Sequence, residues 1–161
     1  MSTSDTISNL DAVFGRMAWL CSRREYCSAA VLEKLRQKGL DDKDAAAVLE
    51  RLVRERYVDD ARYARAFVRD KALLSGWGPR KISFALSAKG ISREVVEEAL
   101  GEVSPEDSEA RMCQVLSAKW KSVSGKTLYE RRTKLLRFAL SRGYSYEAVL
   151  RFLDGYGKKD C

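Results

Sequence analysis

Apolar residues recur along the chain at the spacing of an α-helix, in nine successive stretches. The first stretch forms a single stripe on one helical face, made of Leu10, Val13, Phe14, Met17, Ala18 and Cys21. Similar stripes follow over residues 28–39, 41–53, 60–68, 79–89, 92–100, 104–120, 127–142 and 145–156. Long charged-and-aliphatic stretches with only two prolines are typical of helix rather than sheet, so the pattern predicts an all-α protein.

A basic–glycine–apolar turn occurs three times and divides these helices into groups of three. The turns are Lys38-Gly39-Leu40, Lys89-Gly90-Ile91 and Arg142-Gly143-Tyr144, with glycines 51 and 53 residues apart. Glycine suits this position because the residue that follows a helix usually takes a positive φ, where a Cβ clashes. Two positions after each glycine stands a good helix-capping residue, namely Asp41, Ser92 or Ser145.

A period of about 50 residues in helical units predicts a modular array. Each module contacts mainly its neighbours, so we expect an elongated, curved molecule with one concave face. The predicted three-helix repeats span residues 10–57, 58–103 and 104–157.

Other helix starts carry their own sequence signals. Ser28 and Asp60 are the expected N-caps of the second and fourth helices. Pro79 suits the first position of the fifth helix. Ser104 and Thr127 begin patterns that resemble capping boxes, and these patterns open the seventh and eighth helices.

Charge is distributed unevenly along the array. Residues 1–60 contain ten lysines and arginines against eleven acidic residues, whereas residues 61–161 contain 20 against 12, and the net charge is +7. A purely solubilising surface would mix the two signs along the whole chain. The excess therefore favours a surface that faces a polyanion, such as nucleic acid or an acidic protein surface.

Two dense basic stretches and one helical face supply the candidate binding residues. Arg62, Arg65 and Arg69 fall on one face of the fourth helix. Trp77 and Tyr144 lie beside basic residues, so either could stack on a base, although Trp77 could equally fill the junction between helices. The full candidate set is Arg62, Arg65, Arg69, Lys71, Trp77, Arg80, Lys81, Lys89, Arg93, Lys119, Lys121, Lys126, Arg131, Arg132, Lys134, Arg137 and Arg142.

The sequence offers no catalytic or metal-binding constellation. It has no histidine, which removes the commonest general base and the usual zinc ligand. Its four cysteines form no C-x-x-C pair, so we interpret them as buried or incidental thiols, with oxidative pairing of Cys21 and Cys27 left open. Adjacent Asp59 and Asp60 would diverge on a helix and would not hold one metal ion. We therefore expect a binding protein that is not an enzyme and needs no cofactor.

The first residues lack the basic and apolar regions of a secretory signal, and no apolar run approaches the ~20 residues of a membrane helix. These features predict a cytoplasmic protein that does not enter a membrane. Nothing in the sequence requires more than a monomer.

Three sequence blocks, in this order, resemble the RecX family. The first is Arg23-Arg24-Glu25-Tyr26 followed by Leu32-x-x-Leu35-x-x-Lys38-Gly39. The second is Tyr57-Val58-Asp59-Asp60-x-x-Tyr63-Ala64-x-x-Phe67-Val68-Arg69, and the third is Gly76-x-Gly78-Pro79-x-x-Ile82-x-x-x-Leu86-x-x-Lys89-Gly90-Ile91. Cys27 departs from the pattern, because the family more often has serine or another small capping residue there. Residues after Ser104 resemble the family only in repeat architecture.

The resemblance implies a regulator of the RecA recombinase in DNA repair, recombination and the SOS response. RecX-like proteins bind within the groove of the RecA–DNA filament and suppress ATP hydrolysis and strand exchange, mostly as inhibitors. RecA is thus the expected partner, with single- or double-stranded DNA as a second one. We expect the basic faces of repeats two and three, including Arg131, Arg132 and Lys134, to meet filament or phosphate. The alternatives are a helix-turn-helix protein that acts directly on DNA and an adaptor whose basic charge is incidental.

Overall fold

The computed structural model describes residues 2–155, except for the side chains of Ile7 and Ser8. The ends of the predicted last helix and third repeat, at residues 156 and 157, and one of the four cysteines, Cys161, lie outside this range. The described part contains nine α-helices and one π-helical turn, η1. Their bounds are α1 Thr3–Arg23, α2 Ser28–Gln37, α3 Asp42–Arg54, α4 Asp60–Arg69, η1 Asp70–Leu74, α5 Pro79–Ala88, α6 Arg93–Gly101, α7 Pro105–Ser122, α8 Leu128–Ser141 and α9 Tyr146–Gly155.

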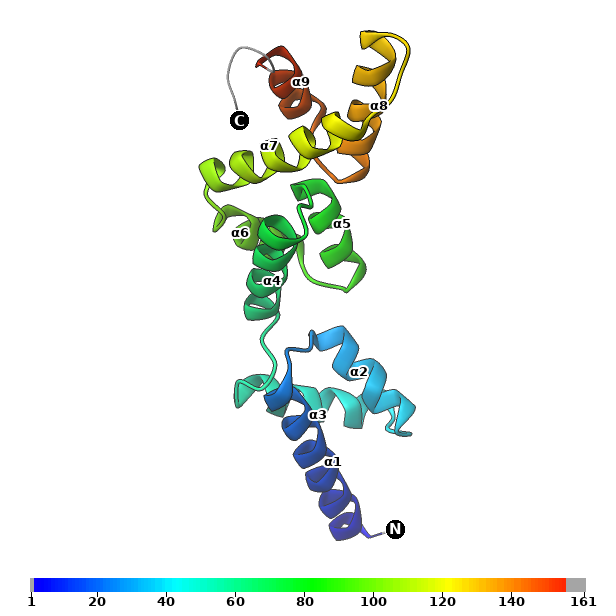
Figure 1. The fold of residues 1–161 in the computed structure, drawn as a ribbon. Coiled ribbons are helices and arrows are strands. Elements are labelled where there is room, and N and C mark those ends of the chain that lie inside the picture. Colours follow the sequence, from blue (N-terminus) through cyan, green and yellow to red (C-terminus); the bar gives the residue numbers. More distant parts are fainter. Residues whose placement is uncertain (1, 156–161) are drawn as a thin grey trace.

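Each group of three helices encloses its own apolar core, and the three groups follow one another along an elongated molecule (Figure 1). Met17, Leu35 and Leu52 are fully buried in the first core. Ile82 and Leu86 occupy the second core, and Leu116, Leu135 and Val149 occupy the third. The predicted all-α array of three-helix repeats is confirmed, while the boundaries at 57/58 and 103/104 stay predictions.

The three turn glycines adopt the conformation that the sequence predicts. Gly39, Gly90 and Gly143 have φ values of 90°, 78° and 93°, a region that residues with a Cβ rarely adopt. The oxygens of Asp41 and Ser92 each accept a hydrogen bond from a backbone N–H three residues later, as predicted for N-caps.

The helix starts of the third repeat also follow the prediction. Ser104, Thr127 and Ser145 cap α7, α8 and α9 with their side-chain oxygens. At α8 the capping box is modified, because the Glu130 carboxylate accepts from the backbone N–H of Lys126.

The predicted caps of α2 and α4 were wrong by one residue each. Asp59, not Asp60, caps α4 by accepting from the backbone N–H of Arg62. Cys27 occupies the N-cap position of α2 and makes no side-chain capping bond, while Ser28 is the first helical residue. The carboxylate of Asp60 accepts from the backbone N–H of Ser28 at 2.8 Å, so the second repeat caps a helix of the first.

The chain from Asp70 to Leu74 forms a π-helical turn that the periodicity did not predict. This turn ends with the backbone N–H of Ser75 bonded to the carbonyl of Asp70, and that of Trp77 bonded to the carbonyl of Lys71. π-Helical turns in proteins occur frequently at functional sites. Here the wider turn precedes the Gly76-Trp77-Gly78 segment that meets the third repeat.

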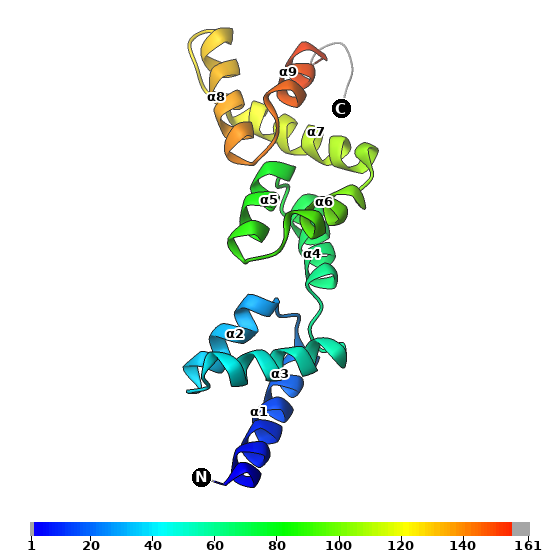
Figure 2. The ribbon, with the colours of Figure 1, turned by 180° about the vertical axis from the view of Figure 1, so that it is seen from behind.

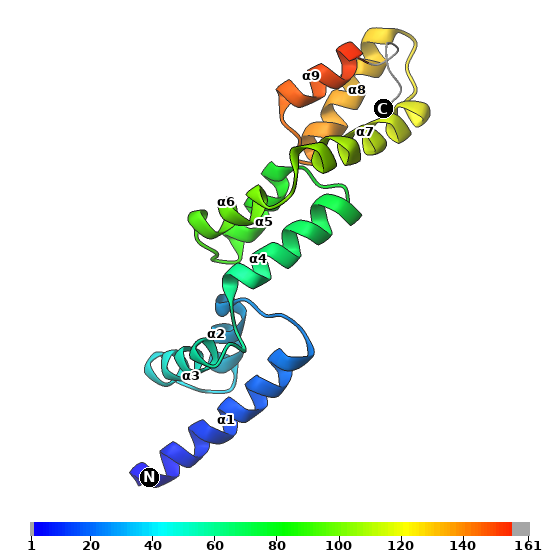
Figure 3. The ribbon, with the colours of Figure 1, turned by 90° about the vertical axis from the view of Figure 1, so that its left-hand side faces the viewer.

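The middle helices of the repeats meet end to end, so their junctions hold the array together. The N-terminus of α2 lies at the C-terminal turn of α5, where the Cys27 thiol is 3.9 Å from the carbonyl oxygen of Lys89. The N-terminus of α5 meets the C-terminal turn of α8 in the same way. The views from behind and from the side show the same serial arrangement (Figures 2 and 3). The molecule is therefore elongated because each repeat touches only its neighbours.

Candidate functional site

The junction between repeats two and three is formed by two backbone segments in direct contact. The N–H of Gly78 donates to the carbonyl of Arg142 at 2.6 Å, and the N–H of Arg80 donates to the carbonyl of Gly143 at 3.1 Å. These bonds satisfy groups that a helix start and a helix end otherwise leave unpaired. A Cβ on Gly78 would lie 2.3 Å from the carbonyl carbon of Gly143, so only glycine fits there.

Three side chains of the third repeat complete the junction. The Tyr144 hydroxyl donates to the carbonyl of Gly76 at 2.7 Å, and the guanidinium groups of Arg142 and Arg111 donate to the carbonyls of Ser75 and Leu74. These bonds satisfy three successive carbonyls before α5, including that of Leu74 at the end of the π-helical turn, which would cost free energy if they were desolvated without partners. The predicted role of Tyr144 as a base-stacking residue was wrong, because only 4 % of its surface is exposed.

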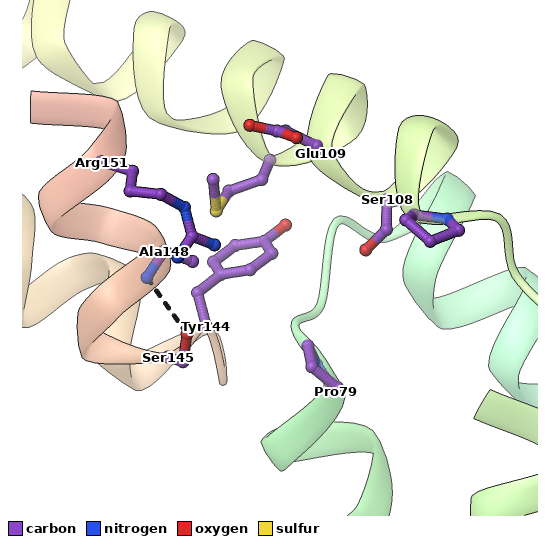
Figure 4. Close-up of a pocket in the computed structure, with 9 residues that line it drawn as sticks. Pro79, Ser108, Glu109, Tyr144, Ser145, Ala148 and Arg151 are labelled. Carbon is purple, nitrogen blue, oxygen red and sulfur yellow. Dashed lines mark hydrogen bonds between the residues drawn. The ribbon is translucent and has the colours of Figure 1, made fainter. Parts of the chain in front are cut away.

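A pocket of about 250 Å³ lies beside Tyr144 (Figure 4). Its walls come from α7, from α9 and from the start of α5, and they include Pro79, Ser108, Glu109 and Arg151. The tyrosine ring forms part of the pocket wall. The pocket is thus a product of the junction and contains both an acidic and a basic side chain at its exposed edge.

Tyr144 should make the stability of the protein sensitive to alkaline pH. Burial raises the pKa of its phenol above the ordinary 10.0, although nearby Arg111 and Arg142 act in the opposite direction. The folded state therefore holds this proton more tightly, and the stabilisation is complete below pH 10 and is lost as pH rises through the folded pKa. We expect Tyr144→Phe to cost about 1 kcal/mol in the free energy of unfolding at neutral pH. Denaturant unfolding between neutral and alkaline pH should show a smaller decline in the variant, and equal declines would contradict this role.

Six of the predicted binding residues gather around this junction. The ammonium groups of Lys71 and Lys81 lie 4.9 and 4.3 Å from the Trp77 ring centre. Across the junction, Lys119 and Arg142 lie 4.9 and 5.1 Å from the ring of Phe138. Arg80 follows Gly78 and Pro79 at the start of α5, where its backbone bonds to Gly143. We call Lys71, Trp77, Arg80, Lys81, Lys119 and Arg142 the junction cluster.

Trp77 in this cluster has a packing role. It is partly buried, belongs to the second core and meets Phe67 edge-on with ring centroids 6.2 Å apart. The electron-rich face of the Trp77 ring attracts the ammonium groups of Lys71 and Lys81. Cation–π pairs of this kind generally contribute about 0.5–2 kcal/mol each. Of the two roles considered for Trp77, the structure therefore favours junction filling, with the ring positioning two cations.

Four other candidate residues form ion pairs within the chain. Arg62 pairs with Glu25 at 2.7 Å and also donates to the carbonyls of Arg56 and Tyr57, which ties repeat two to repeat one. Weaker or more exposed ion pairs are formed by Arg65 with Glu102, Arg93 with Glu97 and Arg132 with Asp154. The glutamate beside Arg93 raises the pKa of that guanidinium, mainly through their hydrogen bond.

The third repeat uses two of its predicted binding residues as internal braces. Arg131 donates to the carbonyl of Trp120 and lies over its ring at 4.2 Å. The Lys134 ammonium donates to the carbonyl of Ser124 at 2.7 Å. Arg131, Arg132 and Lys134 therefore each make a contact within the third repeat, and their part in a binding face stays a prediction.

The remaining candidates, Arg69, Lys89, Lys121, Lys126 and Arg137, are exposed at their positions on the helices and loops. They are spread over repeats two and three. They extend the basic character of the molecule without forming a second compact group.

The acidic pair and two of the cysteines have structural roles. Asp59 and Asp60 each accept a backbone N–H, at the starts of α4 and α2. Burial raises the pKa of the Cys21 thiol, with Glu25 acting in the same direction and Arg62 opposing it. Cys21 and Cys27 are free, buried thiols in different cores. Within residues 2–155, no cluster of potential metal ligands occurs, and no helix is long and apolar enough to cross a membrane.

Sequence reasoning assigned no junction role to Gly78, Arg111 and Glu25, although Gly78 and Glu25 stand in the blocks that resemble the RecX family. The sequence did contain a signal for the role of Gly78. It stands at the N-cap of α5, directly before Pro79, yet glycine has no side chain that could cap the helix, which indicates that it is needed there for another reason. Arg111 and Glu25 gave none, since their partners are backbone carbonyls or an arginine 37 residues away in the sequence.

Together, the fold and the junctions define a tandem helical-repeat protein with three three-helix modules. Comparison with protein families also finds three such modules: residues 15–52, 59–100 and 106–153 match the first, second and third three-helix domains of RecX. The chain therefore belongs to the RecX family of regulatory proteins, which are not enzymes.

Relatives named regulatory protein RecX cover most of the chain. The protein from Chromohalobacter salexigens is 35% identical over 149 residues, which is 92% of each chain. That from Prosthecochloris aestuarii is 30% identical over 96% of this chain and 97% of its own. Against the relative from Clostridium botulinum strain Eklund 17B, at 35% identity, this chain spans only 56% of the relative's length.

The crystal structure of RecX from Lactobacillus salivarius superposes with a TM-score of 0.86 over 95% of this chain and 99% of that one. Since the two sequences are only 19% identical, this likeness establishes the fold alone.

Proposed function

We propose that this chain regulates RecA in the cytoplasm, by binding the RecA–DNA filament and suppressing its ATP hydrolysis and strand exchange. Membership of the RecX family supports the partner. The observation that supports the mode of binding is the junction cluster, where five cations gather at a point that joins two modules.

The junction cluster suits an extended acidic ligand better than a small one. Its cations belong to two repeats, α5 and η1 on one side and α7 and α8 on the other, so one ligand must span the junction to meet them all. Two aromatic rings and the backbone of a rigid junction hold the side chains, which lowers the entropy lost on binding. DNA phosphates or acidic side chains along a filament groove would supply matching charge.

The test is DNA-dependent ATP hydrolysis by RecA on single-stranded DNA, titrated with this protein at several salt concentrations. We expect inhibition at fewer than one copy per RecA subunit, and weaker inhibition as salt rises because the contact is electrostatic. Full RecA activity in the presence of excess folded protein would overturn the proposal.

Direct binding to DNA is the second candidate function, and the same cluster favours it. A protein that neutralises several phosphates loses affinity steeply with salt, with a slope of about −0.9 per contact on duplex DNA. Binding to single- or double-stranded DNA without RecA, measured by fluorescence anisotropy, would support this role. Salt-resistant binding to RecA without DNA would instead favour an adaptor in which the basic charge is incidental.

A further inference from the structure

Every internal junction of the array joins an inserting end of one repeat to a receiving face of the next. The inserting end is the start of the middle helix, which contains Gly78 and Pro79 in repeat two. The receiving face is the first helix and the glycine turn of the following repeat, where Arg111, Val115 and Arg142 contact the preceding loop. The three repeats that the structure describes form two such junctions, so one receiving face and one inserting end have no partner among the described residues.

The repeats can be aligned on their buried residues, which identifies the unused receiving face. Val13, Ala64 and Met112 are buried at matching positions in the first helices, and Met17, Val68 and Leu116 are buried one turn later. In this alignment Ala12, Arg16 and Lys38 of repeat one correspond to Arg111, Val115 and Arg142 of repeat three. These three residues line a groove of about 540 Å³ together with Gly15, Trp19 and Leu20.

The turn glycines show directly that this face is not filled from within the described chain. A Cβ on Gly143 would lie 2.4 Å from the backbone nitrogen of Lys81, and one on Gly90 would lie 3.5 Å from the Cβ of Ala29. Around the same position at Gly39, nothing in the described residues comes within 4 Å. Trp19 at the groove is 58 % exposed, a large apolar surface that the other two receiving faces do not present.

The unused inserting end lies at the opposite end of the molecule (Figure 1). Thr127 is the N-cap of α8, as Gly78 is of α5 and Cys27 of α2. The next two residues, Leu128 and Tyr129, are 60 % and 79 % exposed. Repeat proteins ordinarily close such ends with polar residues, whereas this chain places a tryptophan at one end and a leucine and a tyrosine at the other.

We propose that copies of this protein associate head to tail, with the start of α8 of one copy inserted between α1 and the Gly39 turn of the next. The contact follows the first internal junction, where Cys27, a residue with a Cβ, occupies the N-cap of the inserted helix, so it is continuous with an interface the chain already contains. Because the two surfaces differ, the interface is heterologous and extends into an open chain of copies. Such a chain would continue the elongated array and would allow neighbouring copies to bind a filament cooperatively.

Both ends carry positive charge, which sets the conditions for association. Arg16, Arg23 and Lys38 surround the groove, while Lys121 and Lys126 lie near the start of α8. Like charges oppose the contact in dilute salt, so the free protein is largely monomeric there. Screening by salt strengthens self-association, whereas it weakens binding to a polyanion, so the two activities respond to salt in opposite directions.

The test is sedimentation velocity of the full chain over a range of protein concentrations at low and high salt. We expect the weight-average mass to rise with concentration, more strongly at high salt. X-ray scattering should show particles that grow in length and not in cross-section. A mass that stays monomeric at every concentration and salt would overturn the proposal, and so would a compact, wider dimer.

Complementing variants test the polarity of the contact. Trp19→Asp removes the receiving face and Tyr129→Asp removes the inserting end, so each alone should reduce the association constant at least tenfold. A mixture of the two retains one intact inserting end and one intact receiving face, and should form dimers that grow no further. Phe84→Asp, at an equally exposed aromatic residue on α5, is the control and should associate like the wild type. Failure of the mixture to form dimers would refute the head-to-tail contact, with folding checked by circular dichroism.

These outcomes are separate from those of the proposed RecA regulation. A protein that inhibits RecA and stays monomeric would refute only the head-to-tail contact. A protein that assembles into chains and has no effect on RecA would refute only the regulatory role.

Discussion

Replacing Gly143 with alanine is expected to destabilise the protein by about 3 kcal/mol or more and to detach the third repeat from the second. Two costs add at this residue. Its φ of 93° strains any residue with a Cβ, by roughly 1–2 kcal/mol. The added Cβ would also lie 2.4 Å from the backbone nitrogen of Lys81, and forcing atoms into a packed site costs a further ~1–3 kcal/mol. The backbone contact cannot relax without breaking the bonds to Gly78 and Arg80.

Gly39→Ala is the matched control, because it shares only the first cost. Its φ is 90°, but its Cβ would meet nothing within 4 Å in the described residues. The free energy of unfolding of the Gly39→Ala variant should therefore fall by roughly 1–2 kcal/mol. Denaturant unfolding of both variants, with hydrogen exchange to locate the loss, measures the difference. Equal destabilisation of the two variants would show that the junction adds nothing beyond the strain of the turn.

Reversing charge at Arg80 and Lys81 together should weaken binding to the RecA–DNA filament by about 10- to 100-fold and lower the salt slope by about two. Both residues begin α5 beside the Arg142–Gly143 turn, in the centre of the junction cluster. Arg80 is exposed, and the Lys81 ammonium contacts only the Trp77 ring among the interactions seen there, so the double variant should still fold. The measurement is inhibition of RecA ATP hydrolysis at several salt concentrations.

Lys43→Glu with Arg54→Glu makes the same change of charge on exposed positions of the nearly neutral first repeat. If the junction cluster binds the filament, this control should retain inhibition within a few-fold of the wild type. Equal losses in both double variants would mean that only net charge matters, and unchanged inhibition by the Arg80/Lys81 variant would exclude the cluster. Reversal at Arg131, Arg132 and Lys134 is a poorer test, because these side chains brace the third repeat.

Much of the fold followed from local patterns in the sequence. The helical periodicity, the N-caps at Asp41, Ser92 and Ser104, and the three turn glycines each depend on residues within a few positions of one another. Such short-range preferences can be predicted from the sequence alone, because they act through backbone φ angles, capping hydrogen bonds and the helical period. The threefold recurrence of the glycine turn then gave the modular architecture without any knowledge of long-range contacts.

Long-range contacts decided which candidate side chains remain available for a partner. Counting charge placed the basic excess in repeats two and three, but it treated every arginine and lysine as free. The structure assigns Arg62 to an ion pair with Glu25, Arg131 to a carbonyl eleven residues away, and Asp60 to the start of a helix in the neighbouring repeat. An arginine or lysine that is paired with a distant residue cannot be told from a solvent-exposed one in the sequence, because the sequence gives the charge of a side chain and not its orientation or partner.

The sequence alone therefore determined the class of fold, the number of modules and the polarity of charge along them. The tertiary structure decided how consecutive modules are joined and which side chains form contacts at the junctions. The physical reason is that helices are stabilised by neighbours three and four residues away, whereas the junctions join atoms of residues 32 to 68 positions apart, such as Ser28 and Asp60 or Gly76 and Tyr144. Those contacts exist only after each module has folded and presented its helix ends to the next.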